Sequence, residues 1–271
     1  MNESVARLRG EQLTLGYGKY TVAENLTVEI PDGHFTAIIG PNGCGKSTLL
    51  RTLSRLMTPA HGHVWLDGEH IQHYASKEVA RRIGLLAQNA TTPSDITVQE
   101  LVARGRYPHQ PLFTRWRKED EEAVTKAMQA TGITHLADQS VDTLSGGQRQ
   151  CAWIAMVLAQ ETAIMLLDEP TTWLDISHQI DLLELLSELN REKGYTLAAV
   201  LHDLNQACRY ASHLIALREG KIVAQGAPKE IVTAELIERI YGLRCMIIDD
   251  PVAGTPLVVP LGRTAPSTAN S

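Results

Sequence analysis

The segment IIGPNGCGKSTLLRTL, residues 38–53, is the part of the sequence that most clearly indicates the fold of the whole chain. An apolar run, Phe35–Ile39, leads into it and a helical pattern, residues 47–53, ends it, so the glycines between them join a buried strand to a helix. Gly43 and Gly45 carry no side chain and therefore let several main-chain N–H groups converge on one anion. The helix that follows points its free N–H groups and the positive end of its dipole at the same place. This arrangement predicts a phosphate cradle.

Residues 40–47 fit the pattern G-x-x-x-x-G-K-[S/T], which binds nucleotides. In that pattern Lys46 reaches the β- and γ-phosphates, and the hydroxyl of Ser47 ligates Mg²⁺. The plain alternative is a glycine-rich turn that binds nothing, but the strand before it and the helix after it favour nucleotide binding. The residues expected around the phosphates are Gly40, Pro41, Asn42, Gly43, Cys44, Gly45, Lys46, Ser47 and Thr48.

A second apolar run, AIMLLDEP at residues 163–170, ends in two carboxylates. Ligands of open α/β sheets bind where the strands end, so charges at this position indicate a site rather than a core. Asp168 is expected to hold Mg²⁺, and Glu169 to orient and deprotonate the attacking water. The alternative is an exposed turn before Pro170.

The segment LSGGQRQ, residues 144–150, predicts another helix start that can bind an anion. Ser145 has the position of an N-cap, and two glycines follow it before an apolar helix. One ATP needs only one cradle, so the second start is expected to face the γ-phosphate bound by another copy of the chain. A helix cap without a ligand is the alternative.

The composition narrows the class of protein. The chain has 271 residues and a formal net charge of −6, which argues against a nucleic-acid binder. Its four cysteines form no C-x-x-C pair, as expected of free thiols in a reducing compartment. The longest apolar run, residues 151–159, is far shorter than the ~20 residues that span a membrane. These features predict a cytosolic protein that meets a membrane only through a partner.

The order of strands and helices predicts a covered, mostly parallel sheet. Residues 5–35 alternate as antiparallel strands, a helical block fills residues 90–160, and buried strands are expected at 163–168 and 196–202. A hairpin is expected through Glu219-Gly220, and the polar end of the chain, residues 262–271, is expected to be disordered. In the helix between the two buried strands, one apolar face is formed by Ile176, Ile180, Leu183, Leu186 and Leu189.

Taken in order, these motifs resemble those of the ATP-binding-cassette (ABC) ATPases over about residues 5–245. The likeness includes Gln88 at the end of LLAQ, the D-loop TWLD at 172–175 and His202 after a strand. Within that family, DEPTTWLDISHQIDLLELL and VLHDLNQACRYA resemble cassettes that power import of ferric siderophores and vitamin B12.

The resemblance implies a fold, an activity and partners. It implies an α/β P-loop NTPase with a RecA-like core at about 1–88 and 162–250, an N-terminal antiparallel β subdomain, an inserted α-helical subdomain at about 89–161, and a short extension at 251–271. It implies an ATPase that drives uptake of a ferric siderophore, with ferric enterobactin as the expected cargo. The expected partners are a second copy, two integral-membrane permease subunits at the cytoplasmic face of the inner membrane and, indirectly, a periplasmic siderophore-binding protein; nucleic acid is not expected.

The resemblance also assigns roles to residues. Tyr17 is expected to stack on adenine, although Tyr20 is a nearby rival and Tyr17 could instead be a packing residue. Gln88 is expected to contact Mg²⁺ and the attacking water, and His202 to hydrogen-bond the γ-phosphate. Asp175 is expected to reach the phosphate loop of the second copy. The signature residues expected on that copy's nucleotide are Ser145, Gly146, Gly147 and Gln148.

Two positions depart from the family pattern. Cys151 and Met156 stand where many relatives carry arginine, so the signature helix is expected to lose ion pairs near the dimer interface. Cys44 lies inside the phosphate loop, where alkylation is expected to block ATP binding.

Two other functions stay open: a soluble cassette acting on nucleic acid or ribosomes, and a cassette that does not hydrolyse ATP.

Overall fold

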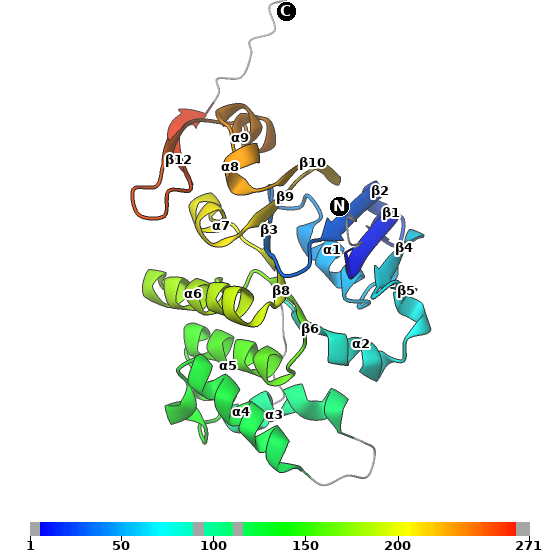
Figure 1. Cartoon of the computed structure of the whole chain (residues 1–271), viewed down its shortest axis with the longest axis vertical. Helices are drawn as coiled ribbons and strands as arrows, with labels where there is room; N and C mark the ends of the chain where they lie inside the picture. Colours follow the sequence, from blue (N-terminus) through cyan, green and yellow to red (C-terminus); the bar gives the residue numbers. More distant parts are fainter. Residues whose placement is uncertain (1–5, 89–94, 111–115, 264–271) are drawn as a thin grey trace, which may run out of the picture.

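The computed structural model describes residues 6–88, 95–110 and 116–263 (Figure 1). The described strands form two large sheets and a two-stranded one. The first sheet is antiparallel with the strand order β2-β1-β4-β5. Its strands are β1 (Leu8–Tyr17), β2 (Tyr20–Ile30), β4 (His61–Leu66) and β5 (Glu69–His70). Buried residues alternate along β1 and β2, so one face of this sheet packs into the core.

The second sheet has six strands in the order β10-β9-β3-β8-β7-β6. Its strands are β3 (Phe35–Ile39), β6 (Ile83–Leu86), β7 (Ile164–Asp168), β8 (Thr196–Val200), β9 (His213–Arg218) and β10 (Lys221–Gly226). All neighbours run parallel except the edge strand β10, and every residue of β3, β7 and β8 is buried. Full burial on both faces is what continuous apolar runs predict for a parallel sheet.

The register of the parallel strands brings three chain segments to one edge. Ile38 of β3 and Asp168 of β7 both pair with Val200 of β8. The segments that follow each of these strands therefore leave the sheet side by side, and they are the segments that carry the predicted phosphate loop, Glu169 and His202.

Alternate residues of the parallel strands point into two different cores. Ile38, Leu166 and Ala198 pack with the antiparallel sheet and with α1 (Lys46–Leu53). Ile39, Leu167 and Ala199 pack on the other face, with α6 (Ile176–Lys193) and α7 (Leu204–Tyr210). The parallel sheet is thus covered on both faces.

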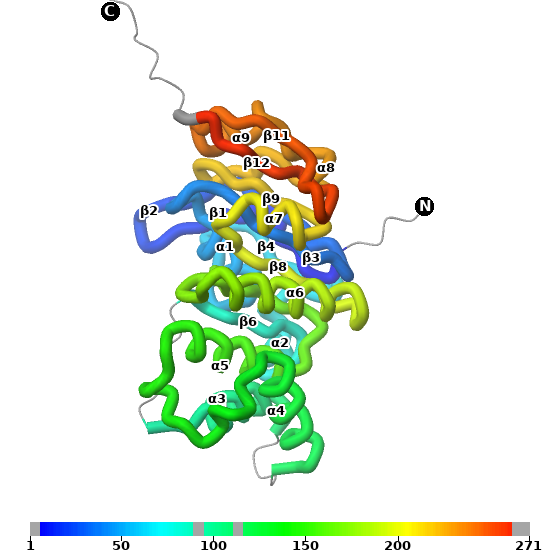
Figure 2. The backbone as a smooth tube through the Cα atoms, turned by 90° about the vertical axis from the view of Figure 1, so that its left-hand side faces the viewer, coloured from blue at the N-terminus to red at the C-terminus, as the bar shows by residue number. Residues whose placement is uncertain are grey.

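A third apolar cluster belongs to the helices at one end of the molecule (Figure 2). These are α3 (Val98–Ala103), α4 (Lys118–Ala130) and α5 (Gly146–Ala159), with 3-10 turns at Arg104–His109, Thr134–Leu136 and Val141–Thr143. The buried guanidinium of Arg106 ties them together, because it lies 2.9 Å from Asp120 Oδ1 on α4 and donates to Ala159 O on α5 at 2.8 Å.

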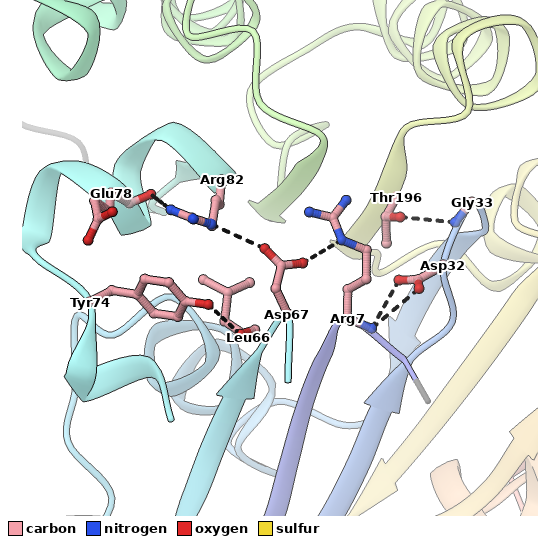
Figure 3. A network of polar contacts seen from close by, with 9 residues as sticks. All are labelled: Arg7, Asp32, Gly33, Leu66, Asp67, Tyr74, Glu78, Arg82 and Thr196. Carbon is pink, nitrogen blue, oxygen red and sulfur yellow. Dashed lines mark hydrogen bonds and ion pairs between the residues drawn. The ribbon is translucent and has the colours of Figure 1, made fainter. Parts of the chain in front are cut away.

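A polar network joins the antiparallel sheet to α2 (Ser76–Arg82) and to the parallel sheet (Figure 3). Asp67, in the turn between β4 and β5, accepts from Arg7 Nε at 2.6 Å and from Arg82 Nε at 3.2 Å. The Thr196 hydroxyl of β8 accepts from Gly33 N at 2.9 Å. These contacts fix the orientation of the antiparallel sheet beside the parallel one. A further 3-10 turn lies at Ile71–His73.

The apolar face predicted for α6 is only partly buried. Leu183, Leu186 and Leu189 are buried, but Ile176 is 75% exposed and Ile180 is 38% exposed. A helical period shows which residues share a face, but it does not show how much of that face other elements cover.

The described chain continues as a hairpin past the domain boundary expected at residue 250, and its last strand includes residues 262 and 263 of the end expected to be disordered. After α8 (Pro228–Ile231) and α9 (Ala234–Tyr241), β11 (Leu243–Asp249) pairs with β12 (Pro256–Arg263). The boundary expected at residue 250 therefore falls in the turn of a hairpin, and residues 264–271 of the expected disordered end lie outside the described residues. Asn205 on α7 fastens the hairpin, because its side chain accepts from Val258 N at 2.7 Å and donates to Val258 O at 3.3 Å.

In the described part of the chain, none of the helices combines the length and the apolar character that crossing a bilayer requires.

Candidate nucleotide site

The phosphate loop has the backbone that its glycines predict. Gly40, Gly43 and Gly45 have φ angles of 149°, 78° and 107°. A Cβ on Gly40 would lie 2.2 Å from Leu217 O, so glycine is needed there for packing, whereas Gly43 has open space around that position. α1 begins at Lys46, and no side chain of the described residues caps its first turn. Its free N–H groups therefore remain available to an anion.

Lys46 is held under the loop rather than pointing into solvent. Its side chain is 5% exposed, and Nζ donates to Gly40 O at 2.8 Å and to Pro41 O at 2.9 Å. These two bonds place a positive charge at the base of the cradle and prevent it from being buried without partners.

Asp168 and Ser47 form an oxygen-rich corner beside the loop. Ser47 Oγ donates to Asp168 Oδ1 at 2.7 Å, while Asp168 Oδ2 is buried and lacks a hydrogen-bond partner among the described residues. Burial raises the pKa of Asp168, and the hydrogen bond from Ser47 partly offsets this. A hard cation such as Mg²⁺ prefers carboxylate and hydroxyl oxygens, so this pair fits the ion expected from the sequence.

Glu169 and His202 meet directly. His202 Nε2 lies 2.8 Å from Glu169 Oε1, and Thr172 Oγ1 donates to Glu169 Oε2 at 3.3 Å. Burial raises the pKa of Glu169, but hydrogen bonds from His202, Gln88 and Thr172 and the charge of His202 outweigh it, so the net pKa is lowered. The carboxylate is therefore ionised at neutral pH and able to accept a proton.

Many of the residues expected around the nucleotide line one cavity of about 490 Å³, whereas Gly40, Pro41, Cys44 and Asp168 are not among its lining residues. Both Tyr17 and Tyr20 line it, so the structure does not choose between them as the adenine contact. Tyr17 Oη lies 3.4 Å from Thr48 Oγ1, which ties this tyrosine to the phosphate loop. The lining residues are Tyr17, Tyr20, Val22, Asn42, Gly43, Gly45, Lys46, Ser47, Thr48, Gln88, Glu169 and His202.

The signature lies elsewhere on the same chain. Ser145 caps α5, since its hydroxyl accepts from Gln148 N at 3.2 Å while Gln148 Oε1 accepts from Ser145 N at 3.0 Å. Ser145, Gly146, Gly147, Gln148 and Asp175 all line a second cavity of about 710 Å³. The two cavities have no lining residue in common.

Comparison with known proteins places the chain in a family. The family model for ABC transporters matches residues 23–172. The chain belongs to the ABC transporter family of ATP-binding cassettes. The expected fold class, ATP as the nucleotide and the ATPase class are thereby confirmed.

Several relatives of this cassette have named roles. It is 99% identical over 271 residues to the ferric enterobactin transport ATP-binding protein FepC of Escherichia coli (strain K12), with 100% of both chains covered. It is 52% identical over 253 residues to a probable siderophore transport ATP-binding protein, YusV, of Bacillus subtilis (strain 168), covering 93% of this chain and 92% of the relative.

Solved structures give the same picture. A putative metal-chelate type ABC transporter in an inward-facing conformation aligns with a TM-score of 0.80 and 29% identity, covering 95% of this cassette and 98% of that chain. A dimeric ATP-binding cassette in a post-hydrolysis state, bound to ADP and Pi, aligns with a TM-score of 0.72 and 27% identity, covering 81% and 98%.

Two glutamines of the cassette contact the segment after Glu169, and a third contacts one of these two; the sequence predicted no role for any of them. Gln150 Nε2 donates to Pro170 O at 3.0 Å, Gln179 Nε2 donates to Leu174 O at 2.9 Å, and Gln206 Nε2 donates to Gln179 Oε1 at 2.9 Å. Nothing in a single sequence marks these positions, because their contacts depend on how three helices pack.

Proposed function

We propose that the cassette is the ATP-hydrolysing subunit of a ferric enterobactin importer. Two copies act at the cytoplasmic face of the inner membrane on two integral-membrane permease subunits, which receive the cargo from a periplasmic siderophore-binding protein. The near-identity to FepC supports the cargo and the direction of transport. The observation that best supports ATP hydrolysis is that Lys46, Glu169 and His202 line the same cavity.

Within that cavity, each residue has a task set by its surroundings. Lys46 and the start of α1 bind the phosphates, and His202 holds Glu169 while facing the γ-phosphate. Ser47 and Asp168, with Gln88 nearby, would hold Mg²⁺, which would supply positive charge beside the phosphate oxygens. Glu169 orients the attacking water and takes its proton. One of the two tyrosines, Tyr17 or Tyr20, stacks on the adenine.

The second copy completes the site. The signature residues and Asp175 line a cavity that shares no lining residue with the phosphate cavity, which supports a site built from two copies. We infer that each ATP lies between the phosphate loop of one copy and Ser145, Gly146, Gly147 and Gln148 of the other. ATP then favours the closed pair, and loss of the γ-phosphate removes that preference.

The division into subdomains is part of the same proposal. A core at about 1–88 and 162–250 carries the phosphate loop, and a helical subdomain at about 89–161 contacts the permease. The separate apolar cluster formed by residues 98–159 supports this division. Gln88 lies where the core leads into the helical subdomain, a position suited to coupling the two.

The test is the substitution Glu169→Gln in the complex with the permease. Loss of the base should lower turnover by about 10²–10⁴-fold, because that is the range that general-base catalysis contributes. ATP should still bind and should hold two copies together, which light scattering measures. Lys46→Ala serves as the contrast, since it should abolish ATP binding itself. Turnover near the parent value in Glu169→Gln would contradict the assigned base.

A further inference from the structure

The segment that follows Glu169 is held in an unfavourable backbone conformation. Glu169 has a φ of 56° and Trp173 has a φ of 70°, although neither is glycine. Left-handed angles at such residues persist only when the surroundings fix them. Residues 170–174 therefore need external contacts that hold them, and these contacts bear on function because the segment joins Glu169 to Asp175.

Side-chain amides supply those contacts at both ends. At the first end, Gln150 of α5 donates to Pro170 O at 3.0 Å. At the second end, Gln179 of α6 donates to Leu174 O at 2.9 Å. Leu174 is 7% exposed, so its carbonyl has few alternatives in solvent, and loss of a partner there is costly.

A further glutamine fixes the direction of the second amide. Gln206 Nε2 donates to Gln179 Oε1 at 2.9 Å. With its oxygen engaged by Gln206, the Gln179 side chain must turn its NH₂ group toward Leu174 O. Gln206 thus determines whether the bond to Leu174 can form.

Gln206 is itself tied to the segment that carries His202. Asp203, the next residue, caps α7 by accepting from Asn205 N at 2.8 Å and from Gln206 N at 2.9 Å. A shift of His202 therefore moves the first turn of α7, and Gln206 with it. The contacts form an unbroken path from His202 through Gln206 and Gln179 to Leu174, the neighbour of Asp175.

We propose that Gln179 and Gln206 are positioning residues that link His202, which faces the nucleotide of its own chain, to Asp175, which faces the second copy. The proposal rests on the proposed function, because it needs an ATP-dependent pair. It explains how the state of one nucleotide reaches the other: the path sets where Asp175 lies against the partner. Neither glutamine lines the phosphate cavity, so each acts on turnover and not on the binding of ATP to one chain.

The experiment compares ATP hydrolysis by the complete transporter carrying Gln179→Ala, Gln206→Glu or both. Gln206→Glu keeps the shape of the side chain but removes the donor, and Gln225→Glu on β10 is the matched control for the added charge. Each single change should lower kcat about tenfold, leave KM for ATP within twofold and bring the Hill coefficient for ATP toward 1. Gln206→Lys, which keeps a donor, should retain most of kcat.

A path in series makes a further demand. The double variant should be no slower than the slower single variant, because one break already interrupts the path. The proposal would be overturned if kcat of the double variant fell about a hundredfold, the product of two independent tenfold losses. An unchanged kcat in both single variants, or a rise in KM that matches the fall in kcat, would overturn it as well. If Gln179→Ala does not fold, Gln206→Glu and Gln206→Lys carry the test. A parent transporter without ATP turnover would overturn the proposed function together with this path, whereas an active parent with unaffected variants overturns the path alone.

Discussion

Cys44 is a thiol inside the phosphate loop, yet it is 6% exposed. Burial raises its pKa, and the nearby charge of Lys46 offsets this only in part. A raised pKa leaves less thiolate at a given pH, so we expect N-ethylmaleimide to react with Cys44 at least tenfold more slowly than with free cysteine at pH 7 and faster as the pH rises. Mass spectrometry of the labelled peptide measures the rate.

Modification of Cys44 should also block ATP binding. A Cβ on Gly40 would lie 2.9 Å from Cys44 Sγ, so an adduct on the sulfur has no space without moving the loop. Cys44→Ala provides the control, because its ATP binding should resist the reagent. Full ATP binding by completely labelled protein would show that the loop tolerates the adduct.

Cys151 stands on the signature helix, where an arginine was expected from the family pattern. The thiol is half-buried, and burial, together with the negative charge of Asp181, raises its pKa. We expect Cys151→Arg to place a guanidinium near Asp181 and to stabilise the fold by up to about 1 kcal/mol, the size of an exposed ion pair. Thermal unfolding measures the gain as a rise in Tm of about 2 °C.

The same substitution combined with Asp181→Asn should show no gain, and Cys151→Met should stay near the parent value. An equal rise in Tm for Cys151→Arg with and without Asp181 would assign the effect to something other than this pair.

Sequence patterns predicted that several side chains of the candidate site would lie together. Lys46, Asp168, Glu169 and His202 follow strands in recognisable motifs, and parallel strands bring such positions to one edge. Gln179 carried no such mark, because an amide's partner depends on which helices meet. The sequence also left Tyr17 and Tyr20 as rivals, and both line the same cavity.

Among the secondary-structure elements, the helical block depends on one buried ion pair. Arg106 Nε lies 2.9 Å from Asp120 Oδ1, and both side chains are nearly inaccessible to solvent. Asp120→Asn leaves the guanidinium with Glu161 and one carbonyl, so we expect a loss of about 3 kcal/mol in the free energy of unfolding. Urea denaturation measures it, and Glu119→Gln on the same helix is the matched control.

This loss should depend on pH in a defined direction. Burial raises the pKa of Asp120, but the hydrogen bonds from Arg106 and Arg117 outweigh it, so the folded pKa is lowered. A lowered folded pKa gives stability that is present above the unfolded value of ~3.9 and is lost as the pH falls through the folded value. The difference between parent and Asp120→Asn should stay constant from pH 7 to about 5 and shrink below about 4. A constant difference down to pH 3 would contradict the assigned pair.

Element types were predictable, whereas their outer limits were not. The strand and helix periods of β7, β8 and α6 are visible in the sequence, since each packs on the core over most of its length. β12 was missed because its polar end resembles a disordered tail, and its anchor, Asn205, lies 53 residues away from Val258. Ile176 shares a helical face with Leu183, but the period could not show that Ile176 would be exposed.

For the molecule as a whole, an exposed apolar patch lies beside the signature residues, and we expect the second copy to bury it. Trp173 is 80% exposed and Ile176 is 75% exposed, close to the residues expected to meet the second copy. If ATP closes the pair, Trp173 should become protected. We expect ATP to lower the acrylamide quenching of Trp173 in the Glu169→Gln variant by about twofold or more. A variant that also carries Trp173→Phe gives the signal of the other tryptophans, which is subtracted.

Lys46→Ala, which should not bind ATP, is the control for this measurement. Equal quenching with and without ATP, at concentrations where light scattering shows pairs, would place the patch outside the interface.

The separation of phosphate loop and signature into two cavities has a genetic consequence. An allele that damages only the loop and an allele that damages only the signature are each inactive when alone in a cell. In a mixed pair, both lesions fall on one nucleotide, and the other nucleotide meets an intact loop and an intact signature. Co-expression of two dead alleles should therefore restore growth on the iron chelate to the extent that a single working site can drive uptake, while two alleles of the same kind should not complement.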